Sequence, residues 1–453
     1  MCSIVEDDFG DDGGAHAMKE DTPQAELAGN EICRKCNIEV AVLKLNQKDP
    51  QCRGCFLSYV RHKFRASLGS TKIVRRGSRV LIILTGTPEN VTLLDMVRFG
   101  LVQDAFKQLR IVPVLLFVDD DFVETPQEDR MQQLARRMQV FKQFESFPSY
   151  YTVCGSSKHV ALTFDKPFSP AGFEQDEQRL MQVLNAVRSV SSKQDLLEQM
   201  RKRTYRAIAQ TLQCSYVFLS DIGVDLAKTL LSNVALGRGC SLAQDVAFCD
   251  DRDETVKLIR PIRDLNPDEV SNYLQYSETP LLSLSSEKHF EDKPSLQNLT
   301  AKFIDNLMQS FPSTVSTVYR TGDKLDAPKA APNRSTANGA EQDAETQDLF
   351  ALFDRTLQLD PPQSLGACCR FCGATLDYRG SKTLFATEYS RLVSSRINAA
   401  CSHEDILQKS KQMELDAERA VNGEEDDQGE RRALMKQLCH GCRNIFEDVS
   451  DGL

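Results

Sequence analysis

An α/β fold with a doubly wound, mostly parallel sheet is predicted by three features of this 453-residue sequence. Short apolar runs rich in Val and Ile alternate with longer segments in which apolar residues recur at helical spacing. In residues 79–109, a buried strand, a polar turn with Gly86 and an amphipathic helix follow one another. A second apolar run, Ile111 to Val118, completes a strand–helix–strand unit. Four CxxC pairs add two cysteine-rich modules that flank this domain.

The remaining elements alternate in the same way. Asn266 and Pro267 have the pattern of a capping residue and a first helical residue, so one more helix is expected to begin there. The loop at 220–222 is predicted to lie beside the loop at 85–90, because both follow strands of one parallel sheet. We expect a helix at 127–144, a strand at 159–164, a helix at 193–212, a strand at 216–219, a loop and helix at 220–231 and a strand at 256–262.

The length and composition indicate a soluble protein with more than one folded unit. A chain of this length exceeds one ordinary hydrophobic core. No run approaches the roughly 18 apolar residues that a membrane-spanning helix needs, and the acidic N-terminus differs from a signal peptide. We therefore expect a cytoplasmic protein without a membrane partner. The net charge of −10 by itself argues against a general nucleic-acid binder.

Two segments of opposite charge lie near the N-terminus. Residues 1–30 carry eight acidic side chains and one Lys, a balance of −7, and are predicted to form an acidic disordered tail. Between Arg53 and Arg79 the sequence has eight basic residues and no Asp or Glu. A solvated helix face normally mixes both signs, so we interpret this segment as a phosphate-contacting site. The candidate residues are Arg61, Lys63, Arg65, Lys72, Arg75 and Arg76.

Two CxxC pairs near the N-terminus have the spacing of a tetrahedral zinc site. Cys33 and Cys36 are separated from Cys52 and Cys55 by fifteen residues. Each CxxC turn presents two sulfurs to the same side, so four thiolates can close on one ion. A closed four-thiolate shell leaves no open coordination position, and the expected zinc is therefore structural. The alternative is a set of unrelated buried thiols.

A second structural zinc site is predicted near the C-terminus. Its two CxxC pairs are separated by sixty-six residues, within which the segment 414–432 is highly charged and is interpreted as an exposed insertion. Cys368 or His440 remains an alternative for one of the ligands. The expected ligands are Cys369, Cys372, Cys439 and Cys442.

Five regions are predicted from these patterns. Residues 326–347 are poor in apolar side chains and rich in Ala, Pro, Asn and Thr, which is typical of a linker. The predicted order is the acidic tail (1–30), an N-terminal four-Cys zinc module (31–68), the α/β domain (70–325), the linker, and a C-terminal zinc knuckle region with a charged insertion (348–453).

In the order of these motifs, the sequence resembles the PP-loop ATP-pyrophosphatases that thiolate tRNA. The four-Cys knuckle, the strand–Gly loop–helix, a second such unit with Asp225, Ala227 and Thr229, an Arg260-Pro261 segment and the terminal knuckle follow in that group's order. Within the group, the sequence is similar to the cytosolic thiouridylase subunit 2 family from about Cys33 to Cys442.

The resemblance implies a role in making 2-thiouridine at the wobble position (U34) of tRNAs for Lys, Glu and Gln. It implies a heterodimer with the catalytic thiouridylase subunit, and sulfur carried as a thiocarboxylate on a ubiquitin-related modifier. With tRNA as a partner, the basic residues between Arg53 and Arg79 become candidate tRNA contacts.

The nucleotide loops depart from the pattern of this group. An ATP-pyrophosphatase loop is normally Ser-Gly-Gly-x-Asp-Ser, in which small residues let backbone N–H groups embrace the phosphates. Thr87 replaces a Gly of the first loop, and Lys228 replaces the Glu of the second loop. These departures argue against ATP as a cofactor. The residues assigned to the degenerate nucleotide loop are Thr85, Gly86, Thr87, Asn90 and Asp225.

Catalytic members also carry a CxxC between the two loops, for sulfur chemistry or an iron–sulfur cluster. This sequence has no CxxC pair between the loops, and Cys154 is the lone thiol in the corresponding part. A lone thiol cannot supply that constellation. We therefore predict a non-catalytic subunit without catalytic residues, which leaves adenylation of the uridine to its partner. The alternatives are an active ATP-dependent tRNA sulfurtransferase with an atypical loop, and a zinc-stabilised scaffold that never contacts RNA.

Overall fold

The computed structural model describes residues 31–45, 48–103, 108–164, 168, 170–285, 289–322, 324–325, 368–374, 376, 434–435 and 437–449. The predicted acidic tail, the linker and the charged insertion at 414–432 lie outside these residues. Within the described part of the chain, no helix is both long enough and apolar enough to cross a membrane.

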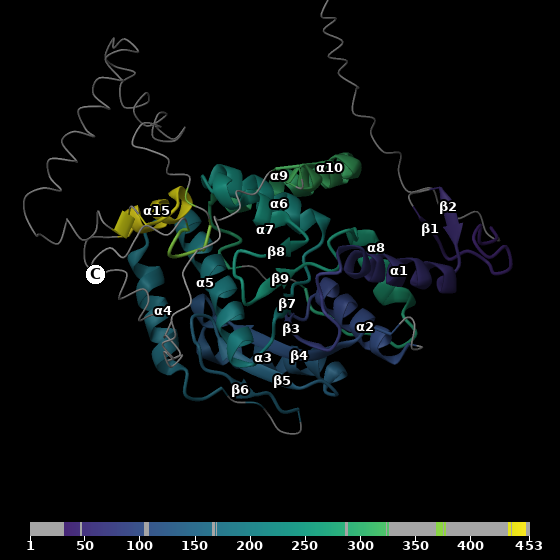
Figure 1. Cartoon of the computed structure of the whole chain (residues 1–453), viewed down its shortest axis with the longest axis horizontal. Helices are drawn as coiled ribbons and strands as arrows, with labels where there is room; N and C mark the ends of the chain where they lie inside the picture. Colours follow the sequence, from purple (N-terminus) through teal and green to yellow (C-terminus); the bar gives the residue numbers. More distant parts are fainter. Residues whose placement is uncertain are drawn as a thin grey trace, which may run out of the picture.

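A seven-stranded sheet lies at the centre of the molecule (Figure 1). Its strands are β3 (Ser78–Leu84), β4 (Ile111–Asp119), β5 (Ser149–Val153), β6 (Val160–Ala161), β7 (Tyr216–Phe218), β8 (Cys249–Asp250) and β9 (Lys257–Ile259). The order is β6-β5-β4-β3-β7-β9-β8, with five parallel inner strands and an antiparallel strand at each edge. The chain proceeds from β3 to one side and then returns to the other, so the predicted doubly wound sheet is confirmed.

Strand β3 is buried on both faces, which explains its unbroken apolar run. Val80 and Ile82 point into one hydrophobic cluster, whereas Leu81 and Ile83 point into another on the opposite face. The first cluster includes residues of α1 (Arg53–Thr71), α2 (Pro88–Val102), α3 (Gln127–Phe141) and α8 (Pro267–Tyr276). The second includes residues of α5 (Val190–Thr211), so helices cover both faces of the sheet.

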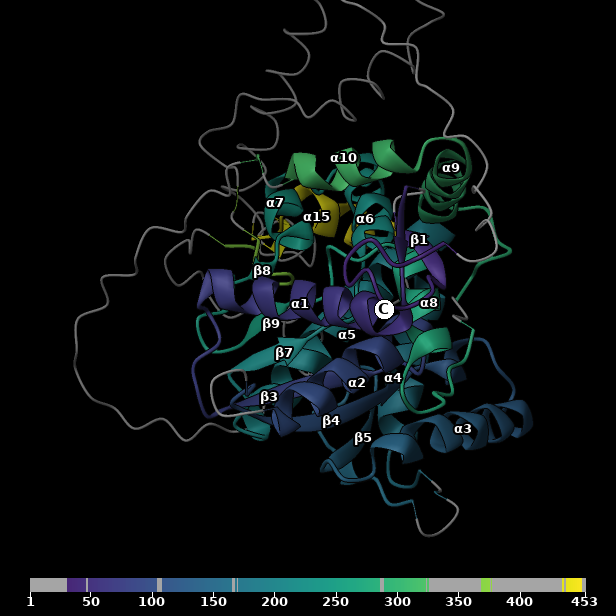
Figure 2. The same ribbon diagram turned by 90° about the vertical axis from the view of Figure 1, so that its right-hand side faces the viewer.

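A separate group of helices packs beside α6, at one end of the molecule. These helices share a cluster that contains Leu226, Val246, Ile304 and Tyr319. Figure 2 shows them together above the sheet. They are α6 (Gly223–Ala235), α7 (Leu242–Val246), α9 (Leu296–Ser310) and α10 (Pro312–Gly322). The short 3₁₀ helices are η1 (Asp121–Val123), η2 (Lys142–Phe144) and η3 (Gly239–Ser241).

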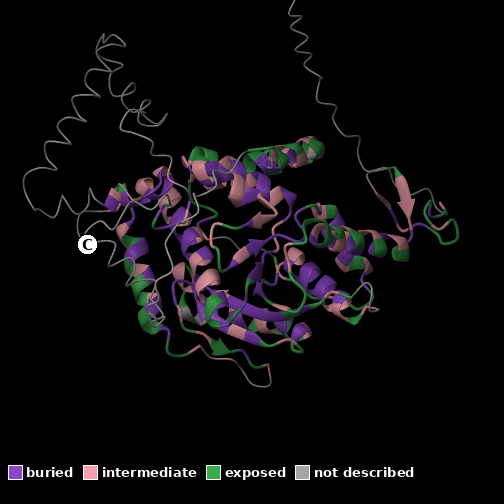
Figure 3. Cartoon of the chain, in the orientation of Figure 1, coloured by how far each residue is buried: buried purple, intermediate pink, exposed green. Residues whose placement is uncertain are grey.

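The two cysteine-rich regions lie on opposite sides of the sheet. The N-terminal one is a small hairpin of β1 (Leu43–Leu45) and β2 (Asp49–Gln51) that protrudes beyond α1 (Figure 1). The predicted boundary at residues 68–70 falls inside α1, which continues to Thr71. At the other side, α15 (His440–Glu447) packs with α4 (Glu174–Ala186) and α5. Figure 3 shows mostly exposed and half-buried residues on the protruding hairpin, and buried residues around the sheet.

The third parallel strand differs from its prediction at 159–164. It is β5, Ser149–Val153, whereas only Val160 and Ala161 pair with it, as a short antiparallel edge. The segment Ser-Tyr-Tyr-Thr-Val lacks the run of aliphatic residues that marked β3 and β4. Tyr151 is nevertheless fully buried, because its hydroxyl donates to Asp119 at the end of β4 (2.7 Å).

Candidate functional site

The loop between β3 and α2 directs its own hydrogen-bond donors inward. The Oδ1 atom of Asn90 accepts from the backbone N–H groups of Thr85 (3.0 Å) and Gly86 (3.2 Å), and its Nδ2 donates to the carbonyl of Ile83 (2.6 Å). The N–H of Thr87 donates to the hydroxyl of Thr85 (3.4 Å). Three N–H groups at the position of a phosphate cradle therefore have partners inside the loop, and in this arrangement the loop does not fit a nucleotide phosphate.

The chain also covers this loop from outside. The backbone N–H of Leu284 donates to the carbonyl of Gly86 (2.8 Å). A β-carbon added to Gly86, which has φ +79°, would lie 3.5 Å from Phe141 and 3.6 Å from Leu284. Thr87 caps α2 by accepting from the N–H of Asn90, and Pro88 begins the helix, as the sequence pattern indicates.

The second loop lies at the same edge of the sheet, because β7 pairs directly with β3. Asp225 accepts from the backbone N–H of Ile222 (3.2 Å), so its carboxylate caps its own helix. The ring of Tyr319 packs on the first turn of α6, where a β-carbon on Gly223 would come within 2.7 Å of it. Its hydroxyl is bonded to the carboxylate of Asp264 (3.2 Å). The predicted proximity of the two loops is confirmed, and Tyr319 covers the helix N-terminus that would face a phosphate.

Cys154 follows β5 and is completely buried. Burial raises the pKa of its thiol well above the ordinary value, and the nearby carboxylate of Asp120 acts in the same direction. The group stays neutral near pH 7 and is a poor nucleophile. It belongs to neither of the cysteine groups formed by the described residues.

The N-terminal cysteines converge as predicted. The ligand atoms of Cys33, Cys36, Cys52 and Cys55 lie within 4.8 Å of one another, and the sulfurs of Cys36 and Cys52 are 3.8 Å apart. Four thiolates at a Zn–S distance of about 2.3 Å in a tetrahedron would be separated by about 3.8 Å, so the group can hold a metal ion such as zinc. Burial opposes ionisation of Cys33, but backbone N–H groups of Cys36, Cys52 and Lys35 outweigh it and lower the pKa of Cys33 to about 6.

The C-terminal cysteines form a second group with the same geometry. Cys369, Cys372, Cys439 and Cys442 lie within 4.8 Å of one another, and the sulfurs of Cys372 and Cys439 are 3.6 Å apart. All four are buried, whereas Cys368 is exposed and outside the group. The group is therefore the one predicted from the two CxxC pairs, and it too can hold a metal ion such as zinc.

Arginine side chains surround the C-terminal group. The guanidinium of Arg238 is buried, lies 3.7 and 3.8 Å from the sulfur of Cys442, and forms an ion pair with Asp195 (2.7 Å). Burial by itself lowers the pKa of Arg238, but Asp195 and then Cys442 hold it well above the usual value. Arg203 donates to the carbonyl of Phe371 in the knuckle (2.7 Å), and burial lowers its pKa to about 10. These cations would offset the net negative charge of four thiolates on one divalent ion.

A third group of possible metal ligands is taken up by arginines. Asp120, Asp121 and His289 lie close together at the carboxyl end of β4. Asp120 is paired with Arg201 (2.5 Å), and Asp121 is paired with Arg137. Because a guanidinium already neutralises each carboxylate, the arrangement is an ion-pair network rather than a metal centre.

Two of the six predicted phosphate-contacting residues are engaged inside the protein. Arg61 is buried on α1, donates to Glu278 (2.9 Å) and Tyr273 (3.3 Å), and stacks on the ring of Phe99. Lys63 donates to both carboxylate oxygens of Glu269 (2.9 Å). These contacts join α1 to α8 and its flanking loop, so the interpretation of Arg61 and Lys63 as RNA contacts is corrected. The absence of acidic residues between Arg53 and Arg79 reflects, in part, acidic partners supplied by a distant segment.

The other four residues have a different setting. Arg65 is half-buried on the last turns of α1, and Lys72, Arg75 and Arg76 are exposed in the connection to β3. Arg65 and Arg76 line one cavity at the C-terminal end of α1, and Lys72 and Arg75 are their neighbours in the sequence.

Known proteins match the chain over nearly its whole length. It is 81% identical to cytoplasmic tRNA 2-thiolation protein 2 of Anopheles gambiae over 99% of the chain and 100% of the relative. The proteins of the same name are 55% identical in Aedes aegypti and 36% identical in Drosophila melanogaster, with at least 99% of each chain covered. The chain belongs to the cytoplasmic tRNA 2-thiolation protein 2 family. The profile of that family matches residues 295–444, which include all four cysteines of the C-terminal group.

Among solved structures, the U34-tRNA thiolase NcsA from Methanococcus maripaludis, with its [4Fe-4S] cluster, is similar to the chain at a TM-score of 0.46 and 14% identity. The match covers 68% of the chain and 94% of the thiolase.

Proposed function

We propose that this chain is the non-catalytic subunit of a cytoplasmic tRNA-thiolating complex that makes 2-thiouridine at the wobble position of tRNAs for Lys, Glu and Gln. Membership in a family whose members are named for tRNA 2-thiolation supports the pathway. The observation that carries the non-catalytic role is the β3–α2 loop, in which Asn90 takes the N–H groups of Thr85 and Gly86. A catalytic thiouridylase subunit adenylates the uridine, and a thiocarboxylated ubiquitin-related modifier delivers the sulfur.

The test of the non-catalytic role uses the full chain without its partner. We expect no ATP binding at micromolar concentrations by calorimetry, and no adenylated tRNA after incubation with ATP. Micromolar ATP binding together with an adenylated product would overturn the proposal in favour of an active sulfurtransferase.

The test of the pathway uses cells. Removal of the chain should abolish 2-thiouridine in the three tRNAs, as measured by mass spectrometry of tRNA nucleosides. The catalytic subunit should co-purify with the tagged chain in equal amount. Unchanged 2-thiouridine in cells without the chain would refute its role in thiolation.

We further propose that each four-cysteine group holds one structural zinc ion. A closed shell of four thiolates fixes local structure and leaves no position for a substrate. Elemental analysis should find two zinc ions per chain, and Cys372→Ser should reduce the content to one. One zinc in the wild-type chain would contradict this assignment.

A further inference from the structure

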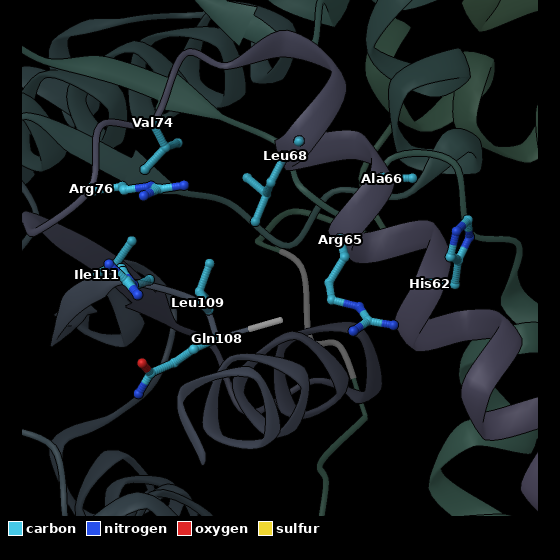
Figure 4. A pocket seen from close by; sticks show the side chains of 11 residues that line it. His62, Arg65, Ala66, Leu68, Val74, Arg76, Gln108, Leu109 and Ile111 are labelled. Carbon is cyan, nitrogen blue, oxygen red and sulfur yellow. The ribbon is translucent and has the colours of Figure 1, made fainter. Parts of the chain in front are cut away.

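A cavity of about 900 Å³ opens at the C-terminal end of α1, away from both nucleotide loops. Its residues come from three segments: the last turns of α1, the connection before β3, and the start of β4. They are His62, Arg65, Ala66, Leu68, Gly69, Val74, Arg76, Gln108, Leu109, Arg110 and Ile111. Figure 4 shows Leu68 and Leu109 pointing toward each other between Arg65 and Arg76.

Backbone hydrogen bonds fix the rim of this cavity. The N–H of Gly77 donates to the carbonyl of Arg110 (2.7 Å), and the N–H of Leu109 donates to the carbonyl of Gly100 (2.8 Å). A β-carbon on Gly100 would come within 3.1 Å of Leu109, so the glycine lets this side chain pack closely against α2. The side-chain amide of Gln108 also donates to the carbonyl of Leu101 (3.0 Å). The cavity is therefore formed before any ligand arrives, which reduces the entropic cost of binding.

The cavity combines an apolar floor with a cationic rim. Leu68, Val74, Leu109 and Ile111 supply the floor, whereas arginines and His62 supply the rim. No acidic side chain is among the described residues that line it. Arg65 and Arg76 have no ion-pair partner in the described part of the chain, in contrast to Arg61 on the same helix. The site suits a ligand that has both a negative charge and a flat, weakly polar body.

We propose that this cavity binds an unstacked nucleotide of the tRNA, with its phosphates on Arg65 and Arg76 and its base against the apolar floor. Guanidinium groups bind phosphate with two hydrogen bonds and stack on bases, which makes arginine suited to both parts of a nucleotide. Proteins recognise RNA sequence mainly through such splayed-out bases in single-stranded loops. This inference rests on the proposed function, because it assumes that the chain contacts tRNA.

The location distinguishes this site from the degenerate nucleotide loop. Arg76 precedes β3 and Ile111 begins β4, so the cavity lies at the amino ends of these strands. The loop containing Gly86 lies at their carboxyl ends. Lys72 and Arg75 are exposed next to the cavity and extend the positive surface along the RNA backbone.

One variant fills the cavity without changing its charge. Gly69 lines the cavity on α1, and a β-carbon there meets no atom within 4 Å. In Gly69→Leu we expect tRNA affinity, measured by fluorescence anisotropy on the full chain, to fall about tenfold with an unchanged slope against salt concentration. Ser70→Leu is the matched control, because Ser70 is exposed on the same helix but does not line the cavity, and it should leave the affinity unchanged.

A second variant removes the charge. Arg65→Gln with Arg76→Gln should weaken tRNA binding by at least tenfold and reduce the salt slope by about two, one for each lost phosphate contact. Binding of AMP to the wild-type chain and to Gly69→Leu distinguishes a free nucleotide from RNA. Loss of AMP binding in Gly69→Leu with unchanged tRNA affinity would assign the cavity to a free nucleotide and overturn the RNA proposal.

The outcomes separate the cavity from the function. Normal tRNA affinity in Gly69→Leu together with weak binding in the double Gln variant would mean a surface phosphate contact only, and the cavity proposal would fail while the proposed function stands. Two results together would refute the cavity proposal and keep the role in thiolation: 2-thiouridine is lost in cells that lack the chain, and the purified wild-type chain does not bind tRNA.

Discussion

The two four-cysteine groups have the same ligands but different surroundings. The N-terminal group lies beside the protruding hairpin, at the start of α1, and Cys36 and Cys55 are only half-buried. All four C-terminal cysteines are buried in a cluster with α4, α5 and α15. The N-terminal cysteine group therefore belongs to a peripheral module, whereas the C-terminal group joins a distant part of the chain to the α/β domain.

The arginines near each group show the same contrast. Arg34 is exposed and pairs with Asp49 (2.5 Å) at the surface. Arg238 is buried between Asp195 and the sulfur of Cys442. Charge compensation is therefore part of the interior at the C-terminal group, and it is left mainly to solvent at the N-terminal group.

The largest expected effect is the loss of stability when a cysteine of the buried C-terminal group is replaced. We expect Cys442→Ser to destabilise the α/β domain by on the order of 5 kcal/mol, since structural zinc is worth about 10–16 kcal/mol in zinc-finger peptides. Cys33→Ser should instead increase hydrogen exchange only in the hairpin and the first turns of α1. Thermal unfolding and exchange mass spectrometry measure the two effects.

The control for these variants is Cys368→Ser, which changes an exposed thiol next to the knuckle. It should retain the wild-type midpoint and zinc content. An equal fall in the domain midpoint for Cys33→Ser and Cys442→Ser would break the comparison, because the N-terminal group would then also support the domain.

The next effect concerns the buried arginine. Arg238→Met leaves Asp195 without its cation in the interior, and breaking a buried ion pair in this way costs about 3–5 kcal/mol. Arg34→Met should cost less than about 1 kcal/mol, because exposed ion pairs contribute little. Urea denaturation gives both values, and similar costs for the two variants would contradict the difference in burial.

The smallest effect is kinetic. A chelator such as EDTA should remove zinc from the N-terminal group at least about tenfold faster than from the C-terminal group, since hairpin opening exposes the former and only larger unfolding exposes the latter. Cys372→Ser and Cys33→Ser each leave one site, so release followed with a zinc dye assigns the two phases. Equal rates in the two variants would show that burial does not control release.

Local patterns made much of the structure predictable. The apolar run of β3, the cap formed by Thr87 and Pro88, and the capping box that starts with Asn266 lie where the sequence places them. CxxC pairs are similarly local, because two residues between cysteines already set the geometry of half a site. Pairing across sixty-six residues was predicted because two CxxC pairs occur near the C-terminus, rather than from local geometry.

The basic segment shows where this reasoning fails. Arg61 and Arg65 are four residues apart on one helix and share a local sequence. Arg61 is buried because Glu278 and Tyr273, more than two hundred residues away, fold against α1. Arg65 instead faces a cavity formed with the start of β4. No pattern around either residue distinguishes the two environments.

The sequence by itself determined the alternation of strands and helices, the eight cysteines and the altered nucleotide loops, because periodicity, spacing and residue type are local properties. The tertiary structure decided how Asn90 and Tyr319 fill the loops, which arginines are buried beside acidic partners, and which surround an open cavity. The physical reason is that burial and charge compensation depend on groups brought together from distant segments, and those groups become neighbours only when the sheet and its helices pack.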